Sequence, residues 1–247
     1  MRLNLKVSIY LICLLSAWVV LCSLLAMPAY ILPHPLDVAS SIIKNSNLLA
    51  WHGFVSLLEI VSGLLVGILL AGVMIFIAER VPRLRTTLFS SLISLQTVPI
   101  FAIIPLFLLW FGHGLITKIL IVGLSSFFPI TANMMQGLER CPEGYLDMAR
   151  LMKSTPGRFF FKVKLPYTLP YLVAGFRIAA VHAPVTVIAA DWIGATHGLG
   201  YLVMLSSGRL QLDLMFSCIF ILIGYSLLFH QLVCWLQRKI LFWRSDS

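Results

Sequence analysis

Charged side chains are scarce in this sequence. Of its 247 residues only 11% are Asp, Glu, Lys or Arg, whereas 60% are hydrophobic and the mean hydropathy is +0.98. Soluble globular domains carry about 25% charged residues, so an ordinary soluble domain is excluded. A membrane-spanning helix needs about 20 mostly apolar residues, and runs of that kind occur at 7–27, 54–78, 88–110, 115–135, 169–192 and 214–236. The sequence therefore predicts an all-α membrane protein with six transmembrane helices in a single domain, 1–247.

Several motifs of enzymes are also missing. The sequence has no GxxxxGK[ST] phosphate loop, no HExxH zinc motif and no CxxC pair among its five cysteines. No convincing Ser, His and Asp set can be assembled from its six scattered histidines. We therefore predict no catalytic residue, metal or cofactor, and no ATP hydrolysis by this chain itself. A self-contained secondary transporter or an intramembrane enzyme stays as the alternative, although the sequence shows no inverted repeat.

Acidic residues are half as frequent as basic ones, 9 against 18, which gives a net charge of +9. With the N-terminus inside, all but four basic residues fall in inner segments; the exceptions are Lys44, Lys118, Arg209 and, within the fifth span, Arg177. Cytoplasmic loops carry such an excess, so both termini are predicted to be cytoplasmic. Anionic membrane lipid accounts for the charge, which gives no argument for nucleic acid. The first span resembles a signal peptide, but Pro28 and Pro33 follow it rather than a small-residue cleavage site, so we expect a retained helix.

Two segments between the spans are long enough to have structure of their own, an external one at 29–53 and an internal one at 136–168. In the external segment, Asp37 is expected to cap a short helix whose Val38, Ile42 and Ile43 rest on the membrane surface. Such a helix would be a lid or a brace, and a simple linker is the alternative.

The internal segment is predicted to form helix, break, helix. Pro142 and Glu143 suit a first helical turn. An apolar face at helical spacing is formed by Tyr145, Met148, Ala149 and Met152. Ser154 or Thr155 can cap a second helix that begins near Pro156, and Pro166 is expected to end it. Two helices this short are marginal in water and need a partner surface.

This internal segment resembles the loop of the permease subunits of bacterial ATP-binding cassette importers, in particular the nitrate, sulfonate and taurine type. That family has EAA, three residues, G, nine residues, then I, any residue, L and P. The aligned residues here are Asp147, Met148, Ala149, Lys153 at the glycine position, Val163, Lys164, Leu165 and Pro166. Further stretches resemble the family in order, namely LPHPLDV, VPIFAIIPLFLLWFG, FFPITANMMQGL, LPYLVAGFRIA and GATHGLGYLV.

The resemblance implies the type I importer permease fold, with 136–168 as a cytoplasmic coupling loop in a bacterial inner membrane. It implies that two copies form the path, that a dimer of separate ATPase subunits binds ATP and grips the loop, and that a periplasmic or lipid-anchored binding protein delivers the solute. The coupling residues carried over are Asp147, Met148, Ala149, Met152, Lys153, Leu165 and Pro166. Lys153 departs from the family, which has glycine at this position. A non-glycine residue in a left-handed conformation costs about 1 kcal/mol. Either the loop bends differently, or contacts with the partner offset this cost.

Polar residues in or near the spans are candidates for the translocation path. They are Gln96, Asn133, His182 and Asp191, with Glu59 beside them. Each has a plainer interpretation: interfacial solvation for Asp191 and Glu59, packing for His182, and bonds between helices for Gln96 and Asn133. The resemblance places Arg177 near the inner end of its helix, where we expect it to extend toward the cytoplasm or to tie the loop to the helix.

The substrate is the least determined property. Members of the resembled family carry sulfonates, taurine, nitrate or heterocyclic vitamin precursors such as the thiamine pyrimidine. Two acids, Glu59 and Asp191, and one interior cation, Arg177, disfavour a dedicated anion path. The sequence therefore favours a neutral or cationic heterocycle.

Overall fold

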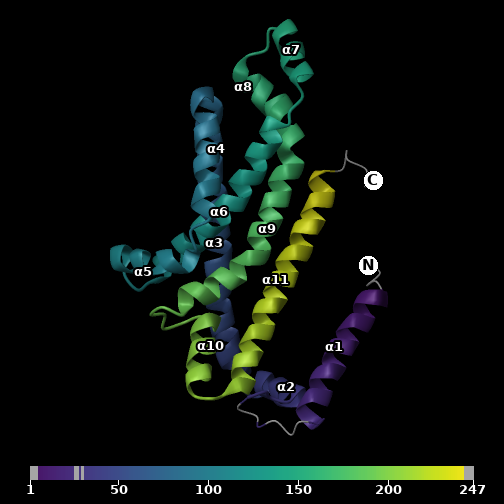
Figure 1. Ribbon diagram of the computed structural model, residues 1–247, viewed down its shortest axis with the longest axis vertical. Coiled ribbons are helices and arrows are strands. Elements are labelled where there is room, and N and C mark those ends of the chain that lie inside the picture. The colour runs from purple at the N-terminus through teal and green to yellow at the C-terminus, as the bar shows by residue number, and fades with distance from the viewer. Residues whose placement is uncertain (1–4, 25–27, 29–30, 242–247) are drawn as a thin grey trace.

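The computed structural model describes residues 5–24, 28 and 31–241, and within these ranges every regular element is a helix. The elements are α1 (Leu5–Leu24), α2 (Pro35–Lys44), α3 (Ser46–Arg80), α4 (Pro82–Gln96), α5 (Ile100–Phe111), α6 (Leu115–Glu139), α7 (Glu143–Leu151), α8 (Pro156–Phe159), the π-helical turn η1 (Phe160–Lys164), α9 (Leu165–Asp191), α10 (Leu199–Gly208) and α11 (Leu212–Ile240). The molecule is elongated, with α7 and α8 at one end and α2 and α10 at the other (Figure 1).

The core forms where α6 packs between α3 and α9. Glycines bring the backbones of α3 and α6 together: a Cβ atom on Gly67 would lie 2.7 Å from Cβ of Ser126 and 3.0 Å from the carbonyl oxygen of Gly123. Side chains such as Ile60, Val122 and Ala180 fill the remaining space and are fully buried. Small residues at such crossings are the usual basis of helix packing in a membrane, where no hydrophobic force drives helices together.

Four helices in the described ranges are long and apolar enough to cross a membrane, namely Ser46–Arg80, Leu115–Glu139, Pro156–Asp191 and Leu212–Ile240. A bent pair of helices can form a fifth span. These coincide with five of the six predicted spans. The predicted span 7–27 corresponds to α1, which is 20 residues long and is not among the four helices above. Positions 25–27 of the predicted span lie outside the described residues.

The predicted span at 88–110 is bent rather than one straight helix. Helices α4 and α5 meet at a bend of 96°. Pro99 lacks an N–H group and disfavours a helical conformation at Val98, so α4 ends before it. The hydroxyl of Thr97 donates a hydrogen bond to the carbonyl oxygen of Ser94 (2.7 Å) and satisfies one of the carbonyls at the end of α4. As a result α5 projects sideways from the bundle (Figure 1).

The external segment forms the short helix α2, but Asp37 does not cap it. Its N-cap is His34, whose Nδ1 accepts a hydrogen bond from the backbone N–H of Leu36 (3.3 Å), and Asp37 falls in the first turn. Val38 is buried, and its carbonyl accepts a hydrogen bond from Ser217 of α11 (3.3 Å), whereas Ile43 is exposed. Helix α2 is therefore tied to α11 through the side on which Val38 lies.

The internal segment is helix, break, helix, but Pro166 does not end the second helix. The chain continues as one helix of 36 residues from Pro156 to Asp191. Pro166 falls in the first turn of α9, directly after η1, and a π-helical turn widens the helix locally. A proline is tolerated there because its missing N–H belongs to a turn whose bonding is already altered. The second helix of the internal segment and the fifth span are thus one continuous helix.

Candidate functional site

Large apolar side chains are exposed on α7 and at Met152, the residue after its end. Met148 and Met152 are 57% and 74% exposed, and the neighbouring Leu151 is 85% exposed. Ala149 is half-buried on the same short helix, and Asp147 is exposed one turn before Leu151. Helices α7 and α8 form a two-helix unit that we call the hairpin. An apolar surface of this kind on it is typical of a docking site for another protein. Leu165 and Pro166 lie elsewhere: both are half-buried, and Leu165 packs against Ile75, Met134 and Leu138 in the bundle.

The bend after α7 has the geometry expected for a family glycine. Lys153 has φ 49°, and the backbone N–H of Ser154 donates to the carbonyl oxygen of Ala149 (2.9 Å), which is the long bond of a Schellman motif. Thr155 then caps α8 by accepting a hydrogen bond from the N–H of Arg158 (3.4 Å). Of the two alternatives for Lys153, the structure has the left-handed bend with its conformational cost.

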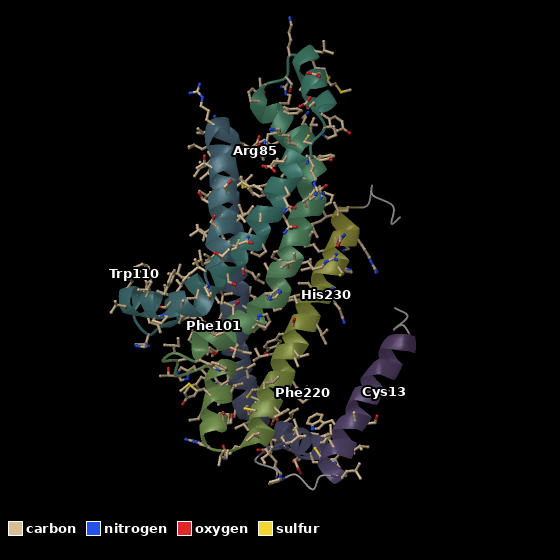
Figure 2. The ribbon with its side chains drawn as sticks, viewed as in Figure 1. Cys13, Arg85, Phe101, Trp110, Phe220 and His230 are labelled. Atoms are coloured by element: carbon tan, nitrogen blue, oxygen red, sulfur yellow. The ribbon has the colours of Figure 1, made fainter. Side chains whose placement is uncertain are left out.

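Three charged residues tie the hairpin to the bundle; we call Glu79, Arg85 and Lys164 the Glu79 clasp. Lys164, the last residue of η1, places its Nζ 2.6 Å from Oε2 of Glu79 at the end of α3. Arg85 of α4 approaches Oε1 of the same carboxylate at 3.8 Å. Figure 2 shows Arg85 near the hairpin end of α4.

A cavity of about 240 Å³ opens between α5, α6 and α9; we call it the His182 cavity. It is lined by Ile100, Phe101, Ser125, Pro129, Ile178, His182, Val185, Thr186 and Ala189. Ser125 and Thr186 share a hydrogen bond between their hydroxyl oxygens (3.1 Å), and Thr186 also approaches the carbonyl oxygen of His182 (3.3 Å). Within the part of the chain that the structure describes, this lining includes no charged side chain. Phe101 lies at the bundle end of α5 and Trp110 at its outer tip (Figure 2).

Two further path candidates, Gln96 and Asn133, and the interior cation Arg177 lie outside this cavity. Gln96 is exposed at the end of α4. Asn133 donates its amide to the carbonyl oxygen of Pro129 (2.8 Å) and so satisfies a backbone group near a proline in α6. Arg177 lies near the middle of α9 rather than at its inner end, and its Nε is buried without a hydrogen-bond partner among the described residues.

Glu59 and Asp191 converge on a cation that the sequence had placed in an outer loop; we call Glu59, Lys118 and Asp191 the Lys118 cluster. The Nζ of Lys118 lies 2.8 Å from Oε1 of Glu59 and 2.5 Å from Oδ1 of Asp191, and it donates to the carbonyl oxygen of His197 (2.8 Å). Both carboxylates are fully buried, and Lys118 is 9% exposed. Asp191 also accepts a hydrogen bond from the N–H of Gly200 (3.1 Å).

This cluster joins α3, α6, α9 and the start of α10. Glu59 and Glu79 are 20 residues apart on α3, a rise of about 30 Å, so the Lys118 cluster and the Glu79 clasp are separated by about one membrane thickness along this helix. Glu59 and Lys118 line a separate cavity of about 120 Å³. The sequence analysis did not identify Lys118 as a partner of these acids. The two carboxylates could have indicated it, since acids buried within spans require a cation.

Residues 63–242 match the family described as binding-protein-dependent transport system inner membrane component. Three curated relatives are similar along most of their length. A probable ABC transporter permease protein of Haemophilus influenzae is 36% identical, covering 92% of this chain and 93% of its own. The formylaminopyrimidine transport permease protein ThiX of Halalkalibacterium halodurans is 30% identical, covering 98% and 97%. A putative aliphatic sulfonates transport permease protein, SsuC of Bacillus subtilis, is 30% identical, covering 94% and 85%.

Among solved structures, a chain of the MetNI methionine ABC transporter, described as inward-facing, superposes with a TM-score of 0.59 at 19% identity. The match covers 78% of this chain and 94% of that chain, and at this identity it shows the fold. The predicted fold class, the type I importer permease fold, is confirmed. Because the family match takes in residues 63–242 and the relatives are similar along nearly the whole chain, this protein belongs to the binding-protein-dependent inner membrane components, the non-catalytic permease subunits of ABC importers.

Proposed function

We propose that this permease subunit carries a small, uncharged heterocycle of the kind represented by pyrimidine vitamin precursors. The observation that carries the proposal is the lining of the His182 cavity, which combines an aromatic ring, an imidazole and two hydroxyl groups with aliphatic side chains. A flat heterocycle can stack on Phe101 and exchange hydrogen bonds with His182 and Thr186. The name of ThiX, a formylaminopyrimidine permease, supports this class.

A sulfonate is the competing substrate, and the name of SsuC favours it. An anion leaving water requires compensating charge or several hydrogen-bond donors, most often from Arg or Lys. The Lys118 ammonium is already held by two carboxylates, and Arg177 is not among the residues that line the His182 cavity. The cavity therefore supports a neutral solute over an anionic one.

The proposed assembly has two copies of this chain side by side in a bacterial inner membrane, with both termini cytoplasmic. The exposed face of α9, with Ile178, His182 and Val185, would meet its counterpart and close the His182 cavity into a path. A solute-binding protein would deliver the solute at the end of the molecule that holds α2 and α10. Two ATPase subunits would grip the α7 face, because the chain has no phosphate loop of its own.

The continuous helix from α8 to α9 supplies a physical route for coupling. It connects the hairpin directly to His182 at the cavity and to Asp191 in the Lys118 cluster. When ATP closes the ATPase dimer, movement of the hairpin would displace this helix and change which side of the membrane the cavity faces.

The substrate proposal is tested with the chain, its ATPase and its solute-binding protein reconstituted in proteoliposomes. Uptake of labelled formylaminopyrimidine is compared with uptake of labelled taurine, each with and without ATP. We expect ATP-dependent accumulation of formylaminopyrimidine, with taurine at the level of empty liposomes. ATP-dependent accumulation of taurine alone would overturn the proposal.

A further inference from the structure

We propose that Glu79 is a positioning residue for coupling: it clamps the π-helical turn at the base of the hairpin, so that hairpin movement is passed to the spans rather than lost at that turn. The inference rests on the proposed coupling role of the hairpin. It concerns a contact within this chain, between the hairpin and the bundle, and not the surface that the ATPase would grip.

The first support is the way the Glu79 carboxylate is shared. One oxygen receives the Lys164 ammonium from η1 at 2.6 Å, and the other faces the Arg85 guanidinium from α4 at 3.8 Å. Glu79 itself lies one residue before the end of α3. A single side chain therefore links the end of one span, the start of the next helix and the base of the hairpin.

The second support is the shielding of these charges. The side chains of Glu79 and Lys164 are each 16% exposed, and that of Arg85 is 22% exposed. Ion pairs on an open surface are weakened by water and salt, whereas a pair this far removed from solvent holds its geometry better. Lys164 also lies over the ring of Phe159 (5.7 Å), which orients it within the turn. Cys141, in the link from α6 to α7, borders the clasp as well, because Lys164, Glu79 and Arg85 are its charged neighbours. Burial raises the pKa of its thiol.

The third support is the place of the clasp along the helix. From Pro156 to Asp191 the chain is α-helical except at the five residues of η1, and Lys164 is the last of them. A π-helical turn inside an α-helix is irregular and is frequent at functional sites. Bending at such a turn would absorb a displacement of the hairpin before it reached His182. Glu79 fixes this turn against α3 and α4, so that the helix moves as one rigid body.

Glu79→Gln is the central variant, because glutamine keeps the shape and removes the charge. Glu139→Gln is the matched control, since Glu139 is an exposed acid at the same end of the molecule, at the end of α6. Lys164→Gln removes the same ion pair by changing its basic partner. It is the variant to measure if Glu79→Gln does not assemble with the ATPase. Glu79→Asp with Lys164→Arg restores the pair, because the longer arginine compensates for the shorter aspartate.

The readout is accessibility of the His182 cavity, measured with the chain assembled with its ATPase in lipid nanodiscs. The five native cysteines are replaced by alanine, Ile178 on the cavity wall is replaced by cysteine, and maleimide labelling is timed without nucleotide and with ATP plus vanadate. ATP hydrolysis is recorded on the same samples. Since coupling between sites commonly amounts to 5–150-fold, we expect Glu79→Gln to reduce the nucleotide-dependent change in labelling at least about fivefold. ATP hydrolysis should continue, and the double variant should regain the change.

The outcomes separate the clasp from the wider proposal. If Glu79→Gln keeps the same nucleotide-dependent change as Glu139→Gln, the clasp has no role in coupling while the hairpin retains its own. If the double variant stays as defective as Glu79→Gln, the ion pair is not the cause and the inference is wrong. If even the parent assembly hydrolyses ATP without any change in labelling, the coupling role of the hairpin fails, and the clasp fails with it.

Discussion

Lys118 and Asp191 meet with a nitrogen-to-oxygen distance of 2.5 Å although they come from different spans, and Glu59 approaches the same ammonium at 2.8 Å from a third. One cation thus serves two fully buried acids. Charges in a membrane interior are tolerated when they pair with one another, so the Lys118 cluster holds α3, α6 and α9 in one register. The cluster is a fixed point at the end of the bundle opposite the hairpin.

Removing the cation should destabilise the protein strongly. Breaking a buried pair by deleting one partner costs about 3–5 kcal/mol, because the remaining charges lose their compensation. We expect Lys118→Met to lower the free energy of unfolding by about that amount, measured by thermal unfolding in detergent. Lys44→Met, at an exposed lysine of α2, is the control and should resemble the wild type. Adding Glu59→Gln and Asp191→Asn to Lys118→Met should recover part of the loss, and no recovery would contradict this account of the cluster.

The left-handed bend of Lys153 predicts a stabilising substitution. Because φ is 49° at this position, Lys153→Gly removes a conformational cost of about 1 kcal/mol without changing the loop. Leu210, with φ 57° at the end of α10, has the same kind of bend, and Leu210→Gly provides a parallel case. Both variants should raise the unfolding temperature, and Lys153→Gly should keep or improve uptake. A sharp loss of uptake would mean that the lysine side chain itself takes part in docking.

The close approach of α3 and α6 is tested by two glycines of the same helix. A Cβ atom at Gly67 would lie 2.7 Å from Cβ of Ser126, whereas at Gly72 nothing lies within 4 Å. Forcing a methyl group into a packed contact costs about 1–3 kcal/mol, so Gly67→Ala should destabilise the protein. Gly72→Ala should be neutral or stabilising by about 0.4–1 kcal/mol. Equal effects of the two substitutions on the unfolding temperature would contradict the packing described.

The helices and the hairpin were predictable because they follow from local patterns. Apolar runs located the spans, and the spacing of Met148, Ala149 and Met152 located α7. Proline was less informative: Pro105, Pro129 and Pro184 lie inside helices, whereas Pro99 divides a predicted span. Whether a proline kinks or ends a helix depends on the contacts available to the freed carbonyls, which tertiary packing decides.

The ion clusters could not be derived in the same way. Lys118 pairs with residues 59 positions before it and 73 positions after it, so its partners depend on how three helices align. Its position near the start of a span made it look like an outer-loop charge. For Glu79 and Lys164, 85 residues apart, the pairing again depends on the packing of η1 against α3.

The His182 cavity predicts a specific transport defect. We expect His182→Ala to reduce uptake of formylaminopyrimidine about tenfold, which corresponds to the loss of about one hydrogen bond, while ATP hydrolysis by the complex continues. Thr186→Val should act in the same direction, because its hydroxyl also lines the cavity. Leu227→Ala, at an exposed position of α11, is the control. Unchanged uptake in His182→Ala would place the path elsewhere.

Co-purification with the ATPase tests most directly the claim that the apolar face of α7 is the coupling surface. Met148→Glu with Met152→Glu places two charges on this face, and Asn47→Glu, at an exposed residue of α3 near the opposite end, is the control. After detergent extraction of the co-expressed complex, the wild type and Asn47→Glu should retain the ATPase in equal amounts, and the double variant should lose it. Retention of the ATPase by a folded double variant would contradict the coupling role of α7.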